Sequence, residues 1–190
     1  MFHLPIRLAG LGRYLPERIV PNSEVEARCH LPAGWIEART GVRERRWVTN
    51  ESNAFMAAQA ARGALTQAGL SLTDLDLIIN ASGTQAQAIP DGAALLQAEL
   101  GLGGSGLPCF SLHATCLSFI AALEVAAGLL GTGRYQRILI VSAEIASCGL
   151  NFAEPESAAL LGDGAAAAVV TRAGEGQSSA FHALRLETYS

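Results

Sequence analysis

Short apolar runs alternate along the chain with segments in which apolar residues recur at helical spacing. The runs at 75–81 and 137–142 are almost continuously apolar, which is typical of strands buried on both faces. Further strands are predicted at 6–11, 107–112, 162–171 and 181–186, and helices at 23–29, 53–68 and 91–100. This alternation favours parallel β-α-β units and therefore predicts an α/β fold.

Polar residues and glycines mark the ends of these predicted helices. Ser23 and Glu26 have the spacing of a capping box at the start of the 23–29 helix. Gly69 follows the 53–68 helix and suits the left-handed conformation in which many helices end. No hydrophobic period is visible between residues 144 and 157, where we expect a loop.

The stretch 108–127, PCFSLHATCLSFIAALEVAA, joins a short strand to a helix, and Cys116 stands at the turn between them. The helix has almost no polar position, so we expect it to lie in the centre of the protein. The dipole and free N–H groups at its start favour a thiolate at Cys116 and an oxyanion beside it, which suits acyl transfer. The alternative interpretation is an inert core cysteine, because free cysteine is among the most buried residue types.

Composition indicates one compact domain over residues 1–190, because half of the 190 residues are hydrophobic and only 16% are charged. No uncharged apolar run has the roughly 18 to 20 residues of a membrane span. The first residues show no basic region followed by an apolar core, so we expect no secretory signal and a cytoplasmic protein.

Several chemistries are excluded by residue usage. The four cysteines form no CxxC pair, so neither a disulfide framework nor a metal site is expected. All 13 basic residues are arginine, which excludes a Schiff-base lysine and the lysine of a phosphate-binding P-loop in this chain. The net charge of −4 provides no general attraction to nucleic acid.

One segment, 34–47 (GWIEARTGVRERRW), concentrates arginine and tryptophan. Arginine forks pair with phosphates and tryptophan faces stack on bases, so this segment could hold a nucleotide-bearing ligand. The alternatives are a solvated basic loop and, less favoured on an acidic chain, a site for single-stranded nucleic acid.

In this order and spacing, the motifs resemble the amino-terminal half of the thiolase-fold condensing enzymes, specifically the β-ketoacyl-acyl-carrier-protein synthase III family. The matching stretches are GRYLPER at 12–18, WIEARTGVRERR at 35–46, DLDLII at 74–79, the Cys116 elbow and LGDGAAAAVV at 161–170. The resemblance implies a layered α-β-α fold that forms the first half of a five-layer αβαβα arrangement.

The resemblance also implies a reaction in fatty-acid or polyketide synthesis. Cys116 would take an acyl group from an acyl-CoA, or from an acyl carrier protein, and condense it with a malonyl thioester. Trp35 and Arg39 match the family's positions for the adenine end of CoA, and Ile89 matches a bulky residue that reaches the partner subunit's acyl tunnel in a dimer. No metal and no cofactor beyond the CoA thioester substrate is implied.

Two departures from the family pattern accompany the resemblance. Cys148 stands where the family often has an arginine that contacts CoA, so CoA binding would be weaker or the donor another carrier. The family's catalytic histidine and asparagine belong to a carboxy-terminal half that would follow Ser190. We therefore expect that a second polypeptide or a further part of a longer chain supplies that half, and that residues 1–190 alone are inactive.

Two alternatives and one further hypothesis stay open at this point. Acyl-Cys116 could pass its acyl group to an alcohol or amine, or the chain could be a non-catalytic scaffold for a partner. Arg43, Arg45 and Arg46 could attract an acidic carrier protein electrostatically.

Overall fold

The computed structural model describes residues 4–187 and 189, and its centre is a five-stranded mixed sheet. The strands are β1 Ile6–Tyr14, β4 Leu77–Asn80, β5 Cys109–Ser111, β6 Arg137–Glu144 and β7 Gly164–Arg172, in the spatial order β1-β7-β6-β4-β5. Strand β4 pairs in parallel with β5 and β6, whereas β7 pairs antiparallel with β6 and β1. The parallel β-α-β prediction thus holds for the β6-β4-β5 half, and it is wrong for the other half.

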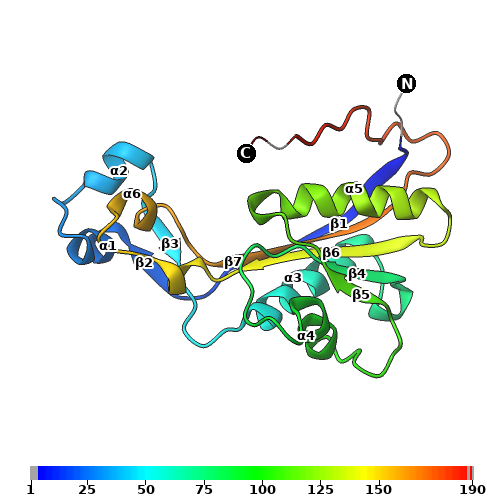
Figure 1. Ribbon diagram of the computed structural model, residues 1–190, viewed down its shortest axis with the longest axis horizontal. Coiled ribbons are helices and arrows are strands. Elements are labelled where there is room, and N and C mark those ends of the chain that lie inside the picture. Colours follow the sequence, from blue (N-terminus) through cyan, green and yellow to red (C-terminus); the bar gives the residue numbers. More distant parts are fainter. Residues whose placement is uncertain (1–3, 188, 190) are drawn as a thin grey trace.

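Helices cover both faces of the sheet, which confirms the layered α-β-α prediction (Figure 1). Helices α3 Asn53–Ala68 and α4 Gly92–Glu99 lie on one face, and α5 Ser118–Gly131 lies on the other. Side chains alternate along each strand, so Ile78 packs beneath α3 while its neighbour Ile79 packs beneath α5. This alternation divides the core into two hydrophobic clusters, one on each side of the sheet.

Helix α5 is buried along one face only, contrary to the expectation of a helix buried all round. Ala122, Ala126 and Leu130 are buried against the sheet. Leu117, just before the helix, and Ile120 within it are 52% and 42% exposed, so an apolar stripe faces away from the sheet. In the described part of the chain, no helix is both long and apolar enough to cross a membrane.

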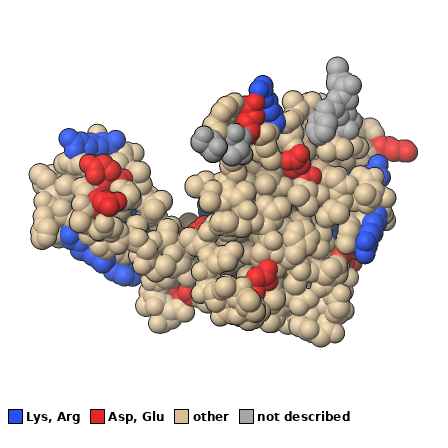
Figure 2. All heavy atoms as spheres, in the orientation of Figure 1, with Lys and Arg blue, Asp and Glu red and all other residues tan. Residues whose placement is uncertain are grey.

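A smaller lobe lies beside the sheet, at the left of Figure 1. It contains the antiparallel strands β2 Ile19–Pro21 and β3 Glu44–Arg46 and the helices α1 Asn22–Arg28, α2 Trp35–Thr40 and α6 Pro155–Ala158. Its own core contains Val20, Val25, Ile36, Trp47 and Ala159. Figure 2 shows a deep indentation between this lobe and the main body.

Most predicted elements occur within a few residues of their expected bounds. Helix α3 matches residues 53–68, and Gly69 ends it at φ 68° as expected. The expected loop over 144–157 contains the turn η3 Ala146–Gly149 and the beginning of α6, and a further turn, η1 Leu72–Asp74, precedes β4.

Two local predictions are wrong. The capping box does not form, because α1 begins at Asn22 and the Glu26 carboxylate instead accepts a hydrogen bond from the Ile36 backbone N–H at 3.1 Å. The last strand, 181–186, is reduced among its described residues to a single bridge between Phe181 and Leu4.

Close packing of α3 on β1 depends on a glycine, which generates a test of the fold. A Cβ at Gly12 would overlap the Ala60 carbonyl oxygen and the Ala64 nitrogen. Gly12→Ala should therefore lower the free energy of unfolding by about 2 to 3 kcal/mol, measured by urea titration. Gly104→Ala, where a Cβ meets nothing within 4 Å, is the matched control and should stay within about 1 kcal/mol of the parent chain. Equal stability of the two variants would contradict this packing.

Candidate active site

Cys116 lies in a sharp turn between β5 and α5. The single turn η2 Thr115–Leu117 precedes the helix, and Thr115 has φ 50°, in the left-handed region that residues other than glycine seldom adopt. Ser118 Oγ accepts a hydrogen bond from the Ala114 N–H at 2.9 Å and donates one to the Thr115 carbonyl at 2.7 Å. These bonds hold the turn in place, and the Cys116 side chain is exposed at the start of α5.

Cys116 opens onto a cavity of about 510 Å³. The cavity lies at the carboxyl ends of β4 and β6, where parallel strands commonly place ligand sites. Its lining residues are Ala81, Gly83, Thr84, Thr115, Cys116, Ser118, Phe119, Ser142, Glu144, Ala146, Leu161 and Gly162. The thiol is therefore accessible to a small-molecule substrate and is not enclosed in the core.

Glu144 ends β6 and lines the same cavity. Its carboxylate accepts hydrogen bonds from the backbone N–H groups of Gly83 and Thr84, both at 2.6 Å, and from the Ser142 hydroxyl at 3.2 Å. Charge-assisted bonds of this length are stronger than neutral ones. Gly83 in turn lies against the elbow, since a Cβ there would come within 3.5 Å of the Thr115 carbonyl oxygen. Glu144 thus fixes the loop after β4 against the Cys116 turn.

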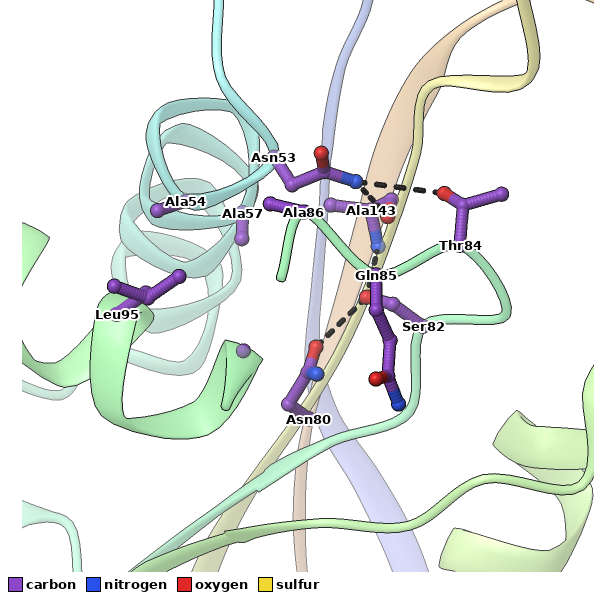
Figure 3. A pocket seen from close by; sticks show the side chains of 11 residues that line it. Asn53, Ala54, Ala57, Asn80, Ser82, Thr84, Gln85, Ala86, Leu95 and Ala143 are labelled. Atoms are coloured by element: carbon purple, nitrogen blue, oxygen red, sulfur yellow. Dashed lines mark hydrogen bonds between the residues drawn. The ribbon is translucent and has the colours of Figure 1, made fainter. Parts of the chain in front are cut away.

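A polar hollow of about 20 Å³ lies on the α3 side of this loop (Figure 3). Ser82 Oγ donates to Asn80 Oδ1 at 2.7 Å and accepts from the Ala143 N–H at 2.9 Å. Asn53, at the start of α3, donates to the Ala143 carbonyl at 2.9 Å. The hollow has about the volume that one water molecule needs. These hydrogen bonds therefore connect the loop after β4 to the start of α3, as the Glu144 carboxylate connects it to the end of β6.

The predicted CoA-binding residues Trp35 and Arg39 lie together on α2 in the smaller lobe. The Arg39 guanidinium carbon is 4.3 Å from the centroid of the Trp35 ring, a cation–π contact. Neither residue lines the Cys116 cavity, which borders the smaller lobe through Leu161 and Gly162. Gly162 packs directly on strand β3 of that lobe. The structure therefore places the pair on the lobe beside the cavity rather than inside it.

Most of the remaining arginine-rich segment supports the lobe and does not face solvent. Arg45 is buried, and it donates to the Ala159 carbonyl at 2.9 Å; burial lowers the pKa of its guanidinium. Trp47 is buried, and Arg46 is half-buried with donor bonds to two backbone carbonyls. The hypothesis of three arginines facing an acidic carrier protein is wrong for Arg45, and it leaves Arg43 as the exposed member.

Ile89 lies in the loop between β4 and α4 and is 89% exposed. It does not line the Cys116 cavity within this chain. An apolar side chain that projects this far from its own chain could reach another protein surface.

The other cysteines differ from Cys116 in their surroundings. Cys29 and Cys109 are half-buried, and burial raises the pKa of both thiols, a change that Arg28 opposes at Cys29 and Asp91 reinforces at Cys109. Cys148 is exposed, with its Sγ 3.1 Å from a backbone carbonyl. Within residues 4–187 and 189, no cluster of three His, Cys, Asp or Glu side chains could hold a metal ion.

Sequence reasoning missed two carboxylates that organise the site. Besides Glu144, the buried Asp163 of the GDGA motif accepts hydrogen bonds from the backbone N–H groups of Val48 and Ser147, both at 2.8 Å. In the sequence, this motif indicates a strand over 162–171 and the family resemblance, but no role for Asp163. A lone acidic residue next to an apolar strand was the available signal for both positions.

The comparisons with known proteins agree with this geometry. A family model described as 3-oxoacyl-[acyl-carrier-protein (ACP)] synthase III matches residues 110–190. The β-ketoacyl-[acyl-carrier-protein] synthase III of Aquifex aeolicus is 38% identical over 87% of this chain and 53% of its own length. The protein of the same name from Deinococcus deserti is 40% identical over 91% of this chain and 49% of its own length.

Solved structures are similar over the same extent. The crystal structure of the Aquifex aeolicus synthase III superposes with a TM-score of 0.84 at 37% identity, covering 90% of this chain and 55% of that chain. The priming β-ketosynthase from the R1128 polyketide pathway gives a TM-score of 0.80 at 34% identity, covering 88% of this chain and 50% of that chain. The chain thus spans about half the length of the relatives that it matches. On these grounds the chain belongs to the 3-oxoacyl-[acyl-carrier-protein] synthase III family of thiolase-fold condensing enzymes.

Proposed function

We propose that this chain is the nucleophile-bearing part of an acyltransferase that loads an acyl group onto Cys116 and condenses it with a malonyl thioester. The observation that carries the proposal is the exposed Cys116 thiol at the start of α5, in a cavity of about 510 Å³. Relatives named as synthases of 3-oxoacyl-acyl-carrier-protein support the same reaction class.

The proposed loading step uses groups placed at the elbow. The Cys116 thiolate attacks the carbonyl carbon of an acyl-CoA, a carbon–sulfur bond forms, and the CoA sulfur leaves and takes a proton. Partial positive charge at the start of α5 favours the anions of this step. The fixed loop at Gly83 and Thr84 confines the thioester between β4 and the elbow.

In the condensation step, a malonyl thioester loses carbon dioxide, and the carbanion attacks the acyl-Cys116 carbonyl. The new carbon–carbon bond forms as the bond to sulfur breaks, which regenerates the Cys116 thiolate. The substrates themselves supply all the atoms, so the proposed chemistry requires no cofactor beyond the CoA thioester that is consumed.

Mass spectrometry of the intact protein tests the loading step. Incubation with acyl-CoA should add one acyl mass, located on the peptide that contains Cys116, and Cys116→Ser should abolish the adduct. Cys148→Ser removes another exposed thiol and should load normally, which makes it the matched control. Failure to form any adduct at Cys116, with all co-purifying chains present, would refute the proposed nucleophile and favour a scaffold role.

We propose that Trp35 and Arg39 bind the adenine and phosphate end of CoA. Two observations support this role: the residue types of the pair, and its place on the lobe that borders the cavity. Arg39 already stacks on the Trp35 face, so it can pair with a phosphate while the indole contacts the base.

The rate of acyl loading with two donors tests this assignment. Trp35→Leu should slow loading from acyl-CoA about tenfold, because it removes one stacking contact that contributes roughly 1 to 2 kcal/mol. Loading from an N-acetylcysteamine thioester, which lacks the nucleotide, should be unchanged. Arg43→Gln removes an exposed arginine of the same lobe and should affect neither donor. An equal loss with both donors would indicate a structural role for Trp35 instead.

We propose that the exposed apolar stripe of α5 is covered in the working enzyme by the second half of the fold. Leu117, Ile120 and Val125 supply this stripe, and bare apolar patches of this kind usually mark an interface. The relatives are about twice as long as the span they share with this chain. Ile89 would extend separately into a partner subunit's acyl tunnel in a dimer, consistent with its exposure.

Size-exclusion chromatography with light scattering tests whether another polypeptide must cover the apolar stripe of α5. The purified chain should self-associate or co-elute with another polypeptide. Ile120→Glu, which places a charge in the stripe, should shift the isolated chain toward the monomer, whereas Glu124→Gln on the exposed side of the same helix should not. A stable, well-folded monomer of the parent chain would contradict the proposal.

A further inference from the structure

A row of polar side chains crosses three adjacent strands at the opposite end of the sheet from Cys116. Arg7 on β1 pairs in register with Thr171 on β7, and Thr171 pairs with Arg137 on β6. The neighbouring Ile6 and Ile138 pack beneath α5. Because side chains alternate along a strand, the row Arg7–Thr171–Arg137 points to the α3 face.

This row lies in a cavity of about 360 Å³ beyond the carboxyl end of α3. The cavity has apolar and aromatic walls as well as cationic ones, and no acidic residue is part of its lining. The lining residues are Arg7, Ala9, Ala68, Leu70, Gly133, Tyr135, Gln136, Arg137, Thr171 and Arg172. Figure 2 shows arginine atoms at the right-hand edge, the edge from which β6 starts in Figure 1.

The arginines of the cavity have unused hydrogen-bonding capacity. Arg7 Nε donates to Thr171 Oγ1 at 3.2 Å, which directs the guanidinium over the row. Arg137 Nε is buried and has no hydrogen-bond partner. In the described ranges 4–187 and 189, the ion pairs involve other arginines, and no carboxylate oxygen lies within 4 Å of a guanidinium nitrogen of Arg7, Arg137 or Arg172. A buried donor without a partner calls for an explanation, and a missing ion is one.

Two carboxylates lie near Arg137, and neither forms an ion pair with its guanidinium. Asp76 Oδ2 accepts hydrogen bonds from the backbone N–H groups of Gln136 and Arg137, both at 2.8 Å. Asp74 accepts from Ser71, whose hydrogen bonds lower the pKa of that carboxyl, with a smaller effect from the charge of Arg137. Neither lines the cavity, so its interior remains cationic.

We propose that this cavity binds the phosphate group of a small organic phosphate. Arg7 and Arg137 would donate to the phosphate oxygens from either side of Thr171, while Leu70 and Tyr135 contact the organic part. Arg137 and Glu144 stand at opposite ends of β6, so this site lies about 23 Å from the edge of the Cys116 cavity. It is therefore independent of the proposed acyl transfer.

Isothermal titration calorimetry with phenyl phosphate, at constant ionic strength, tests the site directly. The parent chain should bind one equivalent saturably, and phenol should not bind. Arg7→Gln and Arg137→Gln should each weaken binding about tenfold to a hundredfold, as expected when a charged hydrogen-bond donor is lost. Arg13→Gln, which removes another exposed arginine of β1 outside the cavity, should bind like the parent.

Circular dichroism of each variant establishes that it is folded before its affinity is compared. Saturable binding that only the two cavity substitutions weaken supports the proposal. The proposal would be overturned by the absence of saturable binding to the folded parent chain, or by equal losses in all three variants, which indicate general electrostatic attraction. If the chain co-sediments with phosphatidic acid vesicles but does not bind phenyl phosphate, the ligand is a lipid headgroup. That result would also overturn the proposal of a small soluble phosphate.

Discussion

The burial of β4 and β6 on both faces is the constraint on which the rest of the structure depends. Ile78 and Ile79, adjacent in sequence, are both fully buried, one beneath α3 and the other beneath α5. A strand that is apolar on both sides requires a helical layer on each face. The close approach of α3 at Gly12 and the placement of α5 both serve this requirement.

The same constraint explains where the chemistry lies. Polar groups cannot be accommodated along these two strands, so they gather where the strands end. Glu144, at the carboxyl end of β6, therefore binds the loop that follows β4, and Gly83 of that loop lies against the Cys116 turn. The Cys116 turn is thus held by its own hydrogen bonds to Ser118 and by packing against the loop that Glu144 fixes.

The arginine-rich segment divides between the surface and the core of the smaller lobe. On α2, Arg39 is exposed and Trp35 is half-buried against the core of the lobe. Arg45 and Trp47 are turned into the core of the lobe, because β3 pairs with β2 and one side of it must be buried. Residue type alone does not separate these roles, since an arginine can satisfy buried carbonyls as well as phosphates.

The sequence by itself determined the four longer helices, most strands and the elbow at Cys116, because hydrophobic period and glycine stops are local signals. The layered fold was implied by the family resemblance of its motifs. The sequence did not determine the antiparallel pairing of β7, the free face of α5 or the burial of Arg45. Nor did it reveal that Glu144 and Asp163 organise the loops, or that Arg7 and Arg137 stand in one row. Those features depend on which distant segments become neighbours, and only the tertiary structure decides that, because strand order and register bring together residues more than 100 positions apart.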